Sequence, residues 1–158
     1  MINAPRVLFG RGAIDRVGAE AEALGQHVLF VCTPSLKASR HAARVRASLG
    51  DRLVAEFAGV EPHVPREVVD AARALAQQQK VDVVVVLGGG SAMGVGKGVV
   101  FRDHPEAGPA PALIAIPTTY AGSEMTPVFG STASSRRTDL RCSARSVVPK
   151  TGVISEPA

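Results

Sequence analysis

Short runs of Val, Leu and Ile alternate along the chain with segments in which apolar residues recur every three or four positions. The runs predict β-strands and the periodic segments predict amphipathic helices. We expect strands at residues 7–9, 27–32, 53–57, 81–87 and 112–116, and helices at residues 14–24, 34–49 and 92–100, with a further helix that begins at Pro65. This alternation is typical of βαβ units and favours an α/β fold whose sheet is mostly parallel, with flanking helices.

Two of these elements carry specific expectations. Thr33 and Pro34 follow the strand 27–32, and they predict a helix with Thr33 as its N-cap and Pro34 as its first residue. Asp82 is the only polar residue in the run 81–87, so this strand is expected to be buried on both faces, as parallel sheets require. We expect Asp82 itself to lie at an edge or to face a helix.

Composition agrees with a globular domain. The chain has 158 residues, 46% of them hydrophobic and 20% charged, which is enough for one sizeable core and argues against disorder. Its first residues do not form a signal peptide, and no run approaches the roughly 20 apolar residues of a membrane span. Cys32 and Cys142 have neither the CxxC spacing nor that of a zinc half-site, so no disulfide framework is expected and the cytoplasm is the predicted location.

The formal net charge of +4 comes mainly from the end of the chain. Residues 1–130 hold 13 Lys and Arg against 12 Asp and Glu, whereas residues 131–158 hold 5 against 2. The arginines of the second segment are interleaved with serines and have no aromatic neighbours, so no nucleic-acid partner is expected. We therefore divide the chain into an α/β domain at 1–130 and an irregular Ser/Arg-rich segment at 131–158 that includes the end of that domain, with a weak hint of a final strand near Gly152-Val153-Ile154.

A glycine-rich turn, Gly88-Gly89-Gly90-Ser91, joins the strand 81–87 to the next helix. Such a turn brings backbone N–H groups close to a phosphate, because glycine has no side chain and the helix start carries a partial positive charge. Neither the G-x-G-x-x-G pattern nor the P-loop pattern fits, because Met93 and Gly98 stand where those patterns need Gly and Ser or Thr. A turn that only allows close strand-to-helix packing is the alternative.

A second loop, residues 117–126, follows the strand 112–116 and is rich in hydroxyl groups. Open α/β sheets bind ligands at the carboxyl ends of their strands, so the two loops are expected to share one site. Hydroxyl donors suit pyrophosphate and ribose, whereas an ordinary polar turn that caps a helix is the alternative. Tyr120 is a candidate for orienting a substrate or for packing over the cofactor ring. We expect Lys97 to face the same site, and Glu124 to cap the following helix rather than act as a base.

No metal site is expected. His27, His41, His63 and His104 lack the spacing that places two ligands on one helical face.

Taken together, Gly88-Gly89-Gly90-Ser91, Lys97 and the run from Ile116 to Thr126 resemble the iron-containing alcohol dehydrogenase superfamily, and within it the maleylacetate reductase branch. Most relatives in the superfamily have an Asp three residues after the Ser of the glycine turn, where this chain has Gly94. The runs Arg6 to Gly12 and His63-Val64-Pro65 also resemble that branch, and the resemblance covers about residues 5–130.

The resemblance implies a dinucleotide-binding domain of the dehydroquinate synthase-like fold and a cofactor that is NAD or NADP. By position, the resemblance implies that the pyrophosphate is held by Gly88, Gly89, Gly90 and Ser91. The pyrophosphate and the nicotinamide-ribose would also accept hydrogen bonds from Thr118, Thr119 and Ser123. The adenosine would border Thr33 and Pro34. No acidic residue ends the second strand, so the preference between the two cofactors stays open.

The activity that the resemblance implies is the NAD(P)H-dependent reduction of maleylacetate to 3-oxoadipate, a step in the breakdown of aromatic compounds. The partner is then a small-molecule substrate, with no nucleic acid and no membrane, and a homodimer is common in the family. Relatives are about twice as long and have a helical second domain that supplies catalytic His residues and any metal ligands. We expect this chain to lack that domain and to be inactive alone. Another alcohol or polyol dehydrogenase and a non-catalytic nucleotide-binding fragment are the alternatives.

Overall fold

A parallel sheet of six strands forms the centre of the protein in a computed structural model that describes residues 6–101, 109–119, 122–126, 130–132 and 151–155. The strands are paired in the order β1-β6-β5-β4-β2-β3, and every pair is parallel. Their bounds are β1 Arg6–Phe9, β2 Val28–Cys32, β3 Leu53–Phe57, β4 Val83–Gly88, β5 Ala112–Pro117 and β6 Thr151–Ser155. The expected α/β class and parallel sheet are confirmed.

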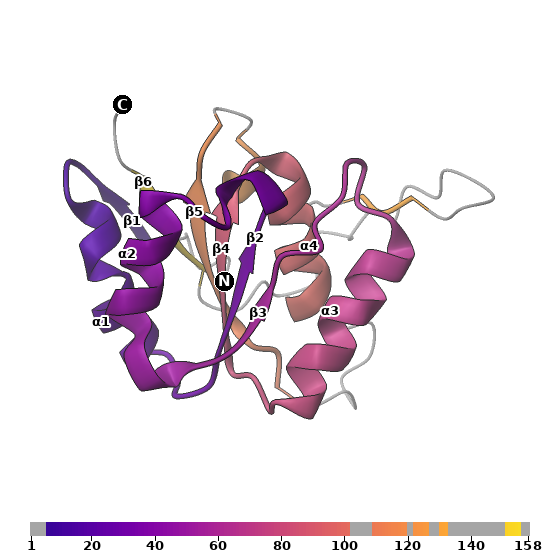
Figure 1. Cartoon of the computed structure of the whole chain (residues 1–158), viewed down its shortest axis with the longest axis horizontal. Coiled ribbons are helices and arrows are strands. Elements are labelled where there is room, and N and C mark those ends of the chain that lie inside the picture. Colours follow the sequence, from indigo (N-terminus) through magenta and orange to yellow (C-terminus); the bar gives the residue numbers. More distant parts are fainter. Residues whose placement is uncertain (1–5, 102–108, 120–121, 127–129, 133–150, 156–158) are drawn as a thin grey trace.

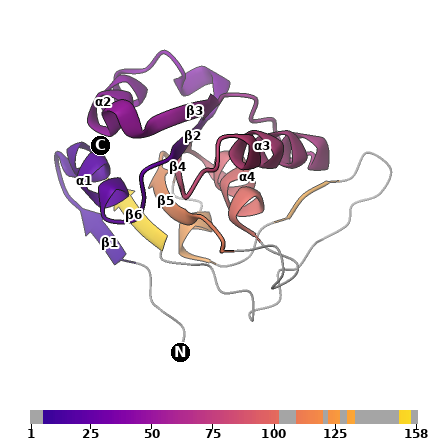
Figure 2. The ribbon, with the colours of Figure 1, turned by 90° about the horizontal axis from the view of Figure 1, so that it is seen from below.

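Helices cover both faces of this sheet (Figures 1 and 2). One face carries α1 and α2, and the other carries α3 and α4. Their bounds are α1 Val17–Glu22, α2 Arg40–Leu49, α3 Arg66–Gln78 and α4 Gly90–Val100, with short 3₁₀ helices at Ala13–Arg16 (η1), Pro34–Leu36 (η2), Gly50–Arg52 (η3) and Ser123–Met125 (η5). Among the described residues, no helix is both long enough and apolar enough to cross a membrane.

The core consists of two apolar layers, because the sheet is buried on both faces. In β4, Val84 and Val86 pack toward α3 and α4, whereas Val83 and Val85 pack toward α1 and α2. Every residue of β2 and β4 is buried. A continuous apolar run therefore corresponds to a central parallel strand, as the sequence predicts.

Two expectations about element boundaries are wrong. The helix after β2 begins at Arg40, and its N-cap is Ser39, whose side chain accepts a hydrogen bond of 3.1 Å from the Ala42 amide. Thr33 and Pro34 do occupy the N-cap and first positions of a helix, but this helix is the short η2, and the Thr33 side chain makes no capping hydrogen bond there. Asp82 precedes β4 and does not lie inside it: its carboxylate accepts hydrogen bonds from the amides of Gln26 and His27 at 3.0 and 2.9 Å.

The end of the chain joins the same sheet. β6 lies between β1 and β5, and Thr132 forms a parallel bridge with Pro65. Part of the segment 131–158 thus belongs to the α/β sheet, because β6 pairs with β1 on one side and with β5 on the other. The hint of a strand at Gly152-Val153-Ile154 is confirmed.

Candidate nucleotide-binding site

The chain leaves the neighbouring strands β2 and β4 in opposite directions. The helix after β2 is α2, on one face of the sheet, and the helix after β4 is α4, on the other face. In open α/β sheets, ligands bind outside the carboxyl ends of the strands where the direction of the connections reverses. This point lies between Cys32 and Leu87, which are paired in register.

Three loops meet there, and the glycine turn is in contact with the other two. A Cβ atom on Gly88 would lie 3.2 Å from the Cγ2 atom of Thr33, which follows β2. A Cβ atom on Gly89 would lie 3.1 Å from the Oγ1 atom of Thr119, which follows β5. The absence of side chains in the turn therefore lets the two threonines approach it closely.

The turn continues into α4, whose N-terminus is open. The N-cap residue Gly89 has no side chain to bond the first amides of the helix, and those amides have no partner within the helix either. Gly90 is exposed, and no atom lies within 4 Å of a Cβ atom placed on it. An uncapped helix start beside open space is a site for an anion such as a phosphate, because the amides and the helix dipole both favour negative charge.

The loop after β5 is fixed to the turn by its backbone. The Thr118 amide donates a hydrogen bond of 3.1 Å to the Gly88 carbonyl, which continues the pairing of Gly88 with Pro117. Thr118 and Thr119 are both exposed at this edge, and Ser123 is half-buried in η5. The loop therefore presents hydroxyl groups beside the helix start.

Lys97 connects α4 to this loop. Its side chain is only 4% exposed, and the Nζ atom donates hydrogen bonds to the carbonyl oxygen of Ser123 and to the Oγ1 atom of Thr126, the latter at 3.3 Å. The Thr126 hydroxyl also donates to the Ser123 carbonyl, at 3.2 Å. Lys97 was expected to face the site. The structure shows it buried, with its ammonium group bonded to the backbone of Ser123, which the sequence places in the site.

Replacement of this cation is expected to loosen η5. In Lys97→Met the apolar volume is similar but the donors to Ser123 and Thr126 are lost, so the amides of Met125 and Thr126 should exchange with solvent about tenfold faster or more. Hydrogen exchange followed by mass spectrometry measures this. Lys80→Met, at an exposed lysine outside α4, is the control. Unchanged exchange at η5 in Lys97→Met would contradict the role.

Most of the sequence-predicted residues come together. The glycine turn approaches Thr33 at Gly88 and Thr119 at Gly89. Pro34 and Gly90 are the chain neighbours of these residues. The remaining predicted residues lie on the same segments: Ser91, Thr118 and Ser123. Tyr120, the candidate for orienting substrate, lies outside the described residues. Glu124 belongs to η5 itself. Sequence reasoning did not assign Lys97 to the support of η5, although a single charge inside the apolar stretch 92–100 is a signal for a buried ion.

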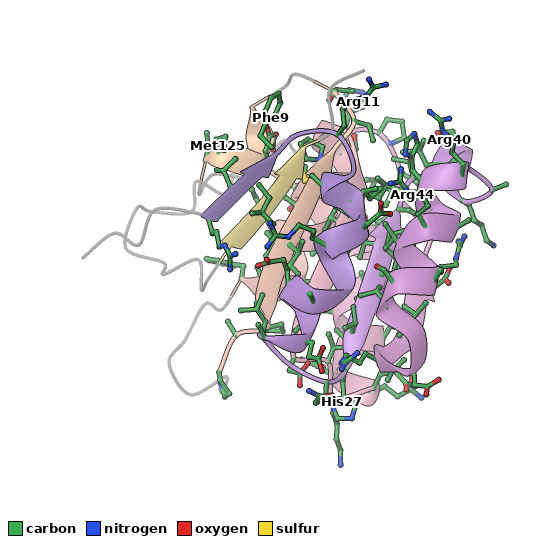
Figure 3. All side chains as sticks on the ribbon, turned by 90° about the vertical axis from the view of Figure 1, so that its left-hand side faces the viewer. Phe9, Arg11, His27, Arg40, Arg44 and Met125 are labelled. Carbon is green, nitrogen blue, oxygen red and sulfur yellow. The ribbon has the colours of Figure 1, made fainter. Side chains whose placement is uncertain are left out.

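Neither Cys32 nor the pair of His27 and Asp82 supplies a reactive group to this edge. Burial raises the pKa of the Cys32 thiol, which keeps it protonated at neutral pH and makes it a poor nucleophile. His27 and Asp82 form a pair at 3.7 Å just before β2 and β4, and Figure 3 shows His27 at the opposite edge from Phe9, the last residue of β1. The described residues contain no group of three or more His, Cys, Asp or Glu that fits a metal ion.

Comparisons with known proteins give a consistent result. The family model of iron-containing alcohol dehydrogenase matches residues 4–156. Maleylacetate reductase from Sphingobium indicum is 39% identical over 152 residues, which are 96% of this chain and 40% of the relative. The crystal structure of maleylacetate reductase from Agrobacterium tumefaciens is 31% identical, with a TM-score of 0.81 over 99% of this chain and 42% of that one.

A more distant structure shares the fold. Sulfoacetaldehyde reductase from Bifidobacterium kashiwanohense, solved in complex with NAD⁺, has a TM-score of 0.82 at 24% identity, and the match covers 97% of this chain and 44% of that one. The chain thus spans about 40% of the length of the relatives that it matches. The resemblance seen in the sequence is confirmed.

Proposed function

The chain belongs to the iron-containing alcohol dehydrogenase family, and on this premise we propose that it is the cofactor-binding part of an oxidoreductase similar to maleylacetate reductase. The relatives from Sphingobium indicum and Agrobacterium tumefaciens carry that name, and one structure of the same fold was solved with NAD⁺. The reaction proposed for the whole enzyme is the reduction of the carbon–carbon double bond of maleylacetate by NADH or NADPH, with 3-oxoadipate as the product.

The residues present fit a dinucleotide. The open N-terminus of α4, with Gly90 and Ser91 in its first turn, is proposed to take the pyrophosphate, because uncapped amides bind anions. Thr118, Thr119 and Ser123 are proposed to donate hydrogen bonds to the pyrophosphate and the nicotinamide-ribose. Thr33 and Pro34 would border the adenosine. The contact of the glycine turn with Thr33 and Thr119 carries this proposal.

When bound, the reduced nicotinamide supplies a hydride to one carbon of the double bond, and a proton must reach the other carbon. The part of this chain that the structure describes contributes binding and orientation. Its hydroxyl groups fix the cofactor, and Lys97 holds the Ser123 backbone in place for that task. Positioning of this kind is itself a large part of catalysis in hydride transfer.

A fluorescence titration of the purified chain with NADH tests the proposal. We expect saturable binding that ADP-ribose reverses and adenosine does not, because the anion site recognises the pyrophosphate and not the base. Circular dichroism under the same conditions reports whether the chain is folded. A folded chain whose NADH signal does not saturate would refute the cofactor role.

The whole reaction needs more than this site. We propose that the chain alone turns over little or no maleylacetate, because it spans only about 40% of the length of the relatives that it matches. Oxidation of NADH by the chain in the presence of maleylacetate, at a rate comparable to that of a longer relative, would overturn this part of the proposal.

The remaining assignments rest on the resemblance and the sequence. We propose a cytoplasmic protein that acts on a small molecule and has neither a nucleic acid nor a membrane as partner, with a homodimer as the form to test first. The described residues offer no group of three or more His, Cys, Asp or Glu that fits a metal ion, so the proposed role of this chain is cofactor binding without a metal ligand among them.

A further inference from the structure

The turn that follows β2 carries positive charge and hydroxyl groups, but no carboxylate. Residues 33–39 read Thr-Pro-Ser-Leu-Lys-Ala-Ser. In dinucleotide-binding folds, an acidic residue near this position binds the ribose 2′-hydroxyl of NAD, whereas a basic residue accommodates the 2′-phosphate of NADP. The chemistry of this turn therefore bears on which cofactor the proposed site takes.

The geometry of the turn brings its polar groups together. η2 closes with a hydrogen bond from the Lys37 amide to the Pro34 carbonyl at 3.3 Å, and the Oγ atoms of Thr33 and Ser35 lie 3.4 Å apart. Thr33 is also the residue that packs against Gly88. The two hydroxyl groups thus lie beside the glycine turn, on the side where the adenosine is proposed to bind.

Lys37 is exposed and forms no ion pair with any residue in the described part of the chain. Lys37 directly follows η2, whose first residue comes two positions after Cys32, the last residue of β2, so Lys37 lies near the carboxyl end of β2. Burial raises the pKa of the Cys32 thiol, and the charge of Lys37 opposes that effect. Arg40 adds a second exposed cation at the same edge, where Figure 3 shows it with Arg11.

The carboxylate of the neighbouring strand β3 is paired with an arginine. Glu56 of β3 accepts hydrogen bonds from the Nε and Nη2 atoms of Arg46 at 2.7 and 3.0 Å. The guanidinium of Arg46 also lies over the ring of Phe30, 5.6 Å from its centre, and donates to the Lys37 carbonyl at 2.9 Å. These contacts direct the Glu56 carboxylate toward Arg46 of α2, so its negative charge is already balanced by a cation.

We propose that residues 33–37 bind the 2′-phosphate of NADP(H), with Lys37 as its cationic partner and Thr33 and Ser35 as hydroxyl donors, so that the chain binds NADPH in preference to NADH. This inference rests on the proposed function and concerns the adenosine end of the same site. A phosphate dianion gains charge-assisted hydrogen bonds from an ammonium group such as that of Lys37, which pairs with no carboxylate of the described residues. The adenosine ribose of NAD carries no 2′-phosphate, so NAD gains no such hydrogen bonds.

Parallel titrations of the chain with NADPH and NADH test this inference. We expect NADPH to bind at least threefold more tightly. Lys37→Gln should weaken NADPH binding about three- to tenfold and change NADH binding less than twofold, because only the 2′-phosphate interacts with this cation. Ser35→Asp should reverse the preference, since its carboxylate repels the 2′-phosphate. Lys80→Gln removes the same charge at an exposed lysine far along the chain and should leave the ratio unchanged.

A second measurement isolates the phosphate. Adenosine 2′,5′-bisphosphate should displace bound NADPH more strongly than 5′-AMP does, and Lys37→Gln should remove the difference. Equal affinities for the two cofactors, or a loss in Lys37→Gln that is the same for both, would overturn the inference and leave the proposed function standing. If neither cofactor binds to the folded chain, both the inference and the proposed function fail.

Discussion

The substitution Gly90→Asp is expected to abolish dinucleotide binding and to leave the protein folded. Gly90 is exposed at the start of α4, and a Cβ atom placed on it has no other part of the described structure within 4 Å. A carboxylate in the first turn interacts favourably with the helix dipole, by about 0.3–1 kcal/mol, so stability should be unchanged or slightly higher. The same carboxylate would stand where the pyrophosphate is proposed to bind. Juxtaposed like charges cost several kcal/mol, which corresponds to at least about a hundredfold loss of NADH affinity.

Gly90→Asn separates the charge from the bulk. Asn has nearly the same size as Asp but no charge, so this variant should lose much less affinity than Gly90→Asp, and thermal unfolding of both should match that of the parent chain. The comparison needs only NADH titrations and thermal melts. If Asp and Asn weaken binding equally, repulsion of a phosphate is not the cause, and the assignment of the helix start as the anion site is wrong.

The second large effect is expected at Gly94, where stability and not binding should change. A Cβ atom on Gly94 would lie only 2.6 Å from the Cγ2 atom of Val64. Val64 cannot easily move, because its backbone has a φ of 52° and its carbonyl accepts a hydrogen bond of 3.0 Å from the Thr132 amide. A β-branched residue in the left-handed region is held there only by strong surrounding contacts. Gly94→Ala should therefore cost about 1–3 kcal/mol through overpacking.

A double-mutant cycle gives this prediction a sharp test. Val64→Ala removes the methyl groups that meet the new Cβ atom, so the double variant should be more stable than the sum of the two single changes predicts, by about 1 kcal/mol or more. Urea unfolding measures the three variants. Gly90→Ala, in the same helix but with nothing near its Cβ atom, is the control and should not be destabilised. Equal effects of Gly94→Ala and Gly90→Ala on stability would contradict the proposed contact.

This contact also explains two features that the sequence presents separately. In the sequence, Gly94 and the run His63-Val64-Pro65 contribute separately to the resemblance to the maleylacetate reductase branch. The structure shows that Val64 packs against Gly94, and that Thr132 fixes the turn by a hydrogen bond from its hydroxyl to the His63 carbonyl at 2.9 Å. Gly94 in α4 thus leaves the space that the Val64 side chain of the strained turn needs.

Elements that depend on a local pattern of residues can be predicted from the amino-acid sequence. Continuous apolar runs identify β2, β4 and β5, because a strand buried on both faces needs apolar side chains at every position. The glycine turn and the hydroxyl-rich loop could be placed at strand ends because each directly follows one of these apolar runs. Once the strands are known to be parallel, their carboxyl ends must lie at one edge, and the candidate site follows.

The tertiary structure alone decided which distant residues meet. The place of β6 between β1 and β5 and the reach of Lys97 to Ser123 and Thr126 join segments that are far apart in the chain. The contact between Val64 and Gly94 and the hydrogen bonds from the Gln26 and His27 amides to Asp82 do the same. Hydrophobic periodicity reports only whether a position is buried. Which partner it meets is set by packing all the helices and strands at once, because each close contact must satisfy the shapes and hydrogen bonds of both segments.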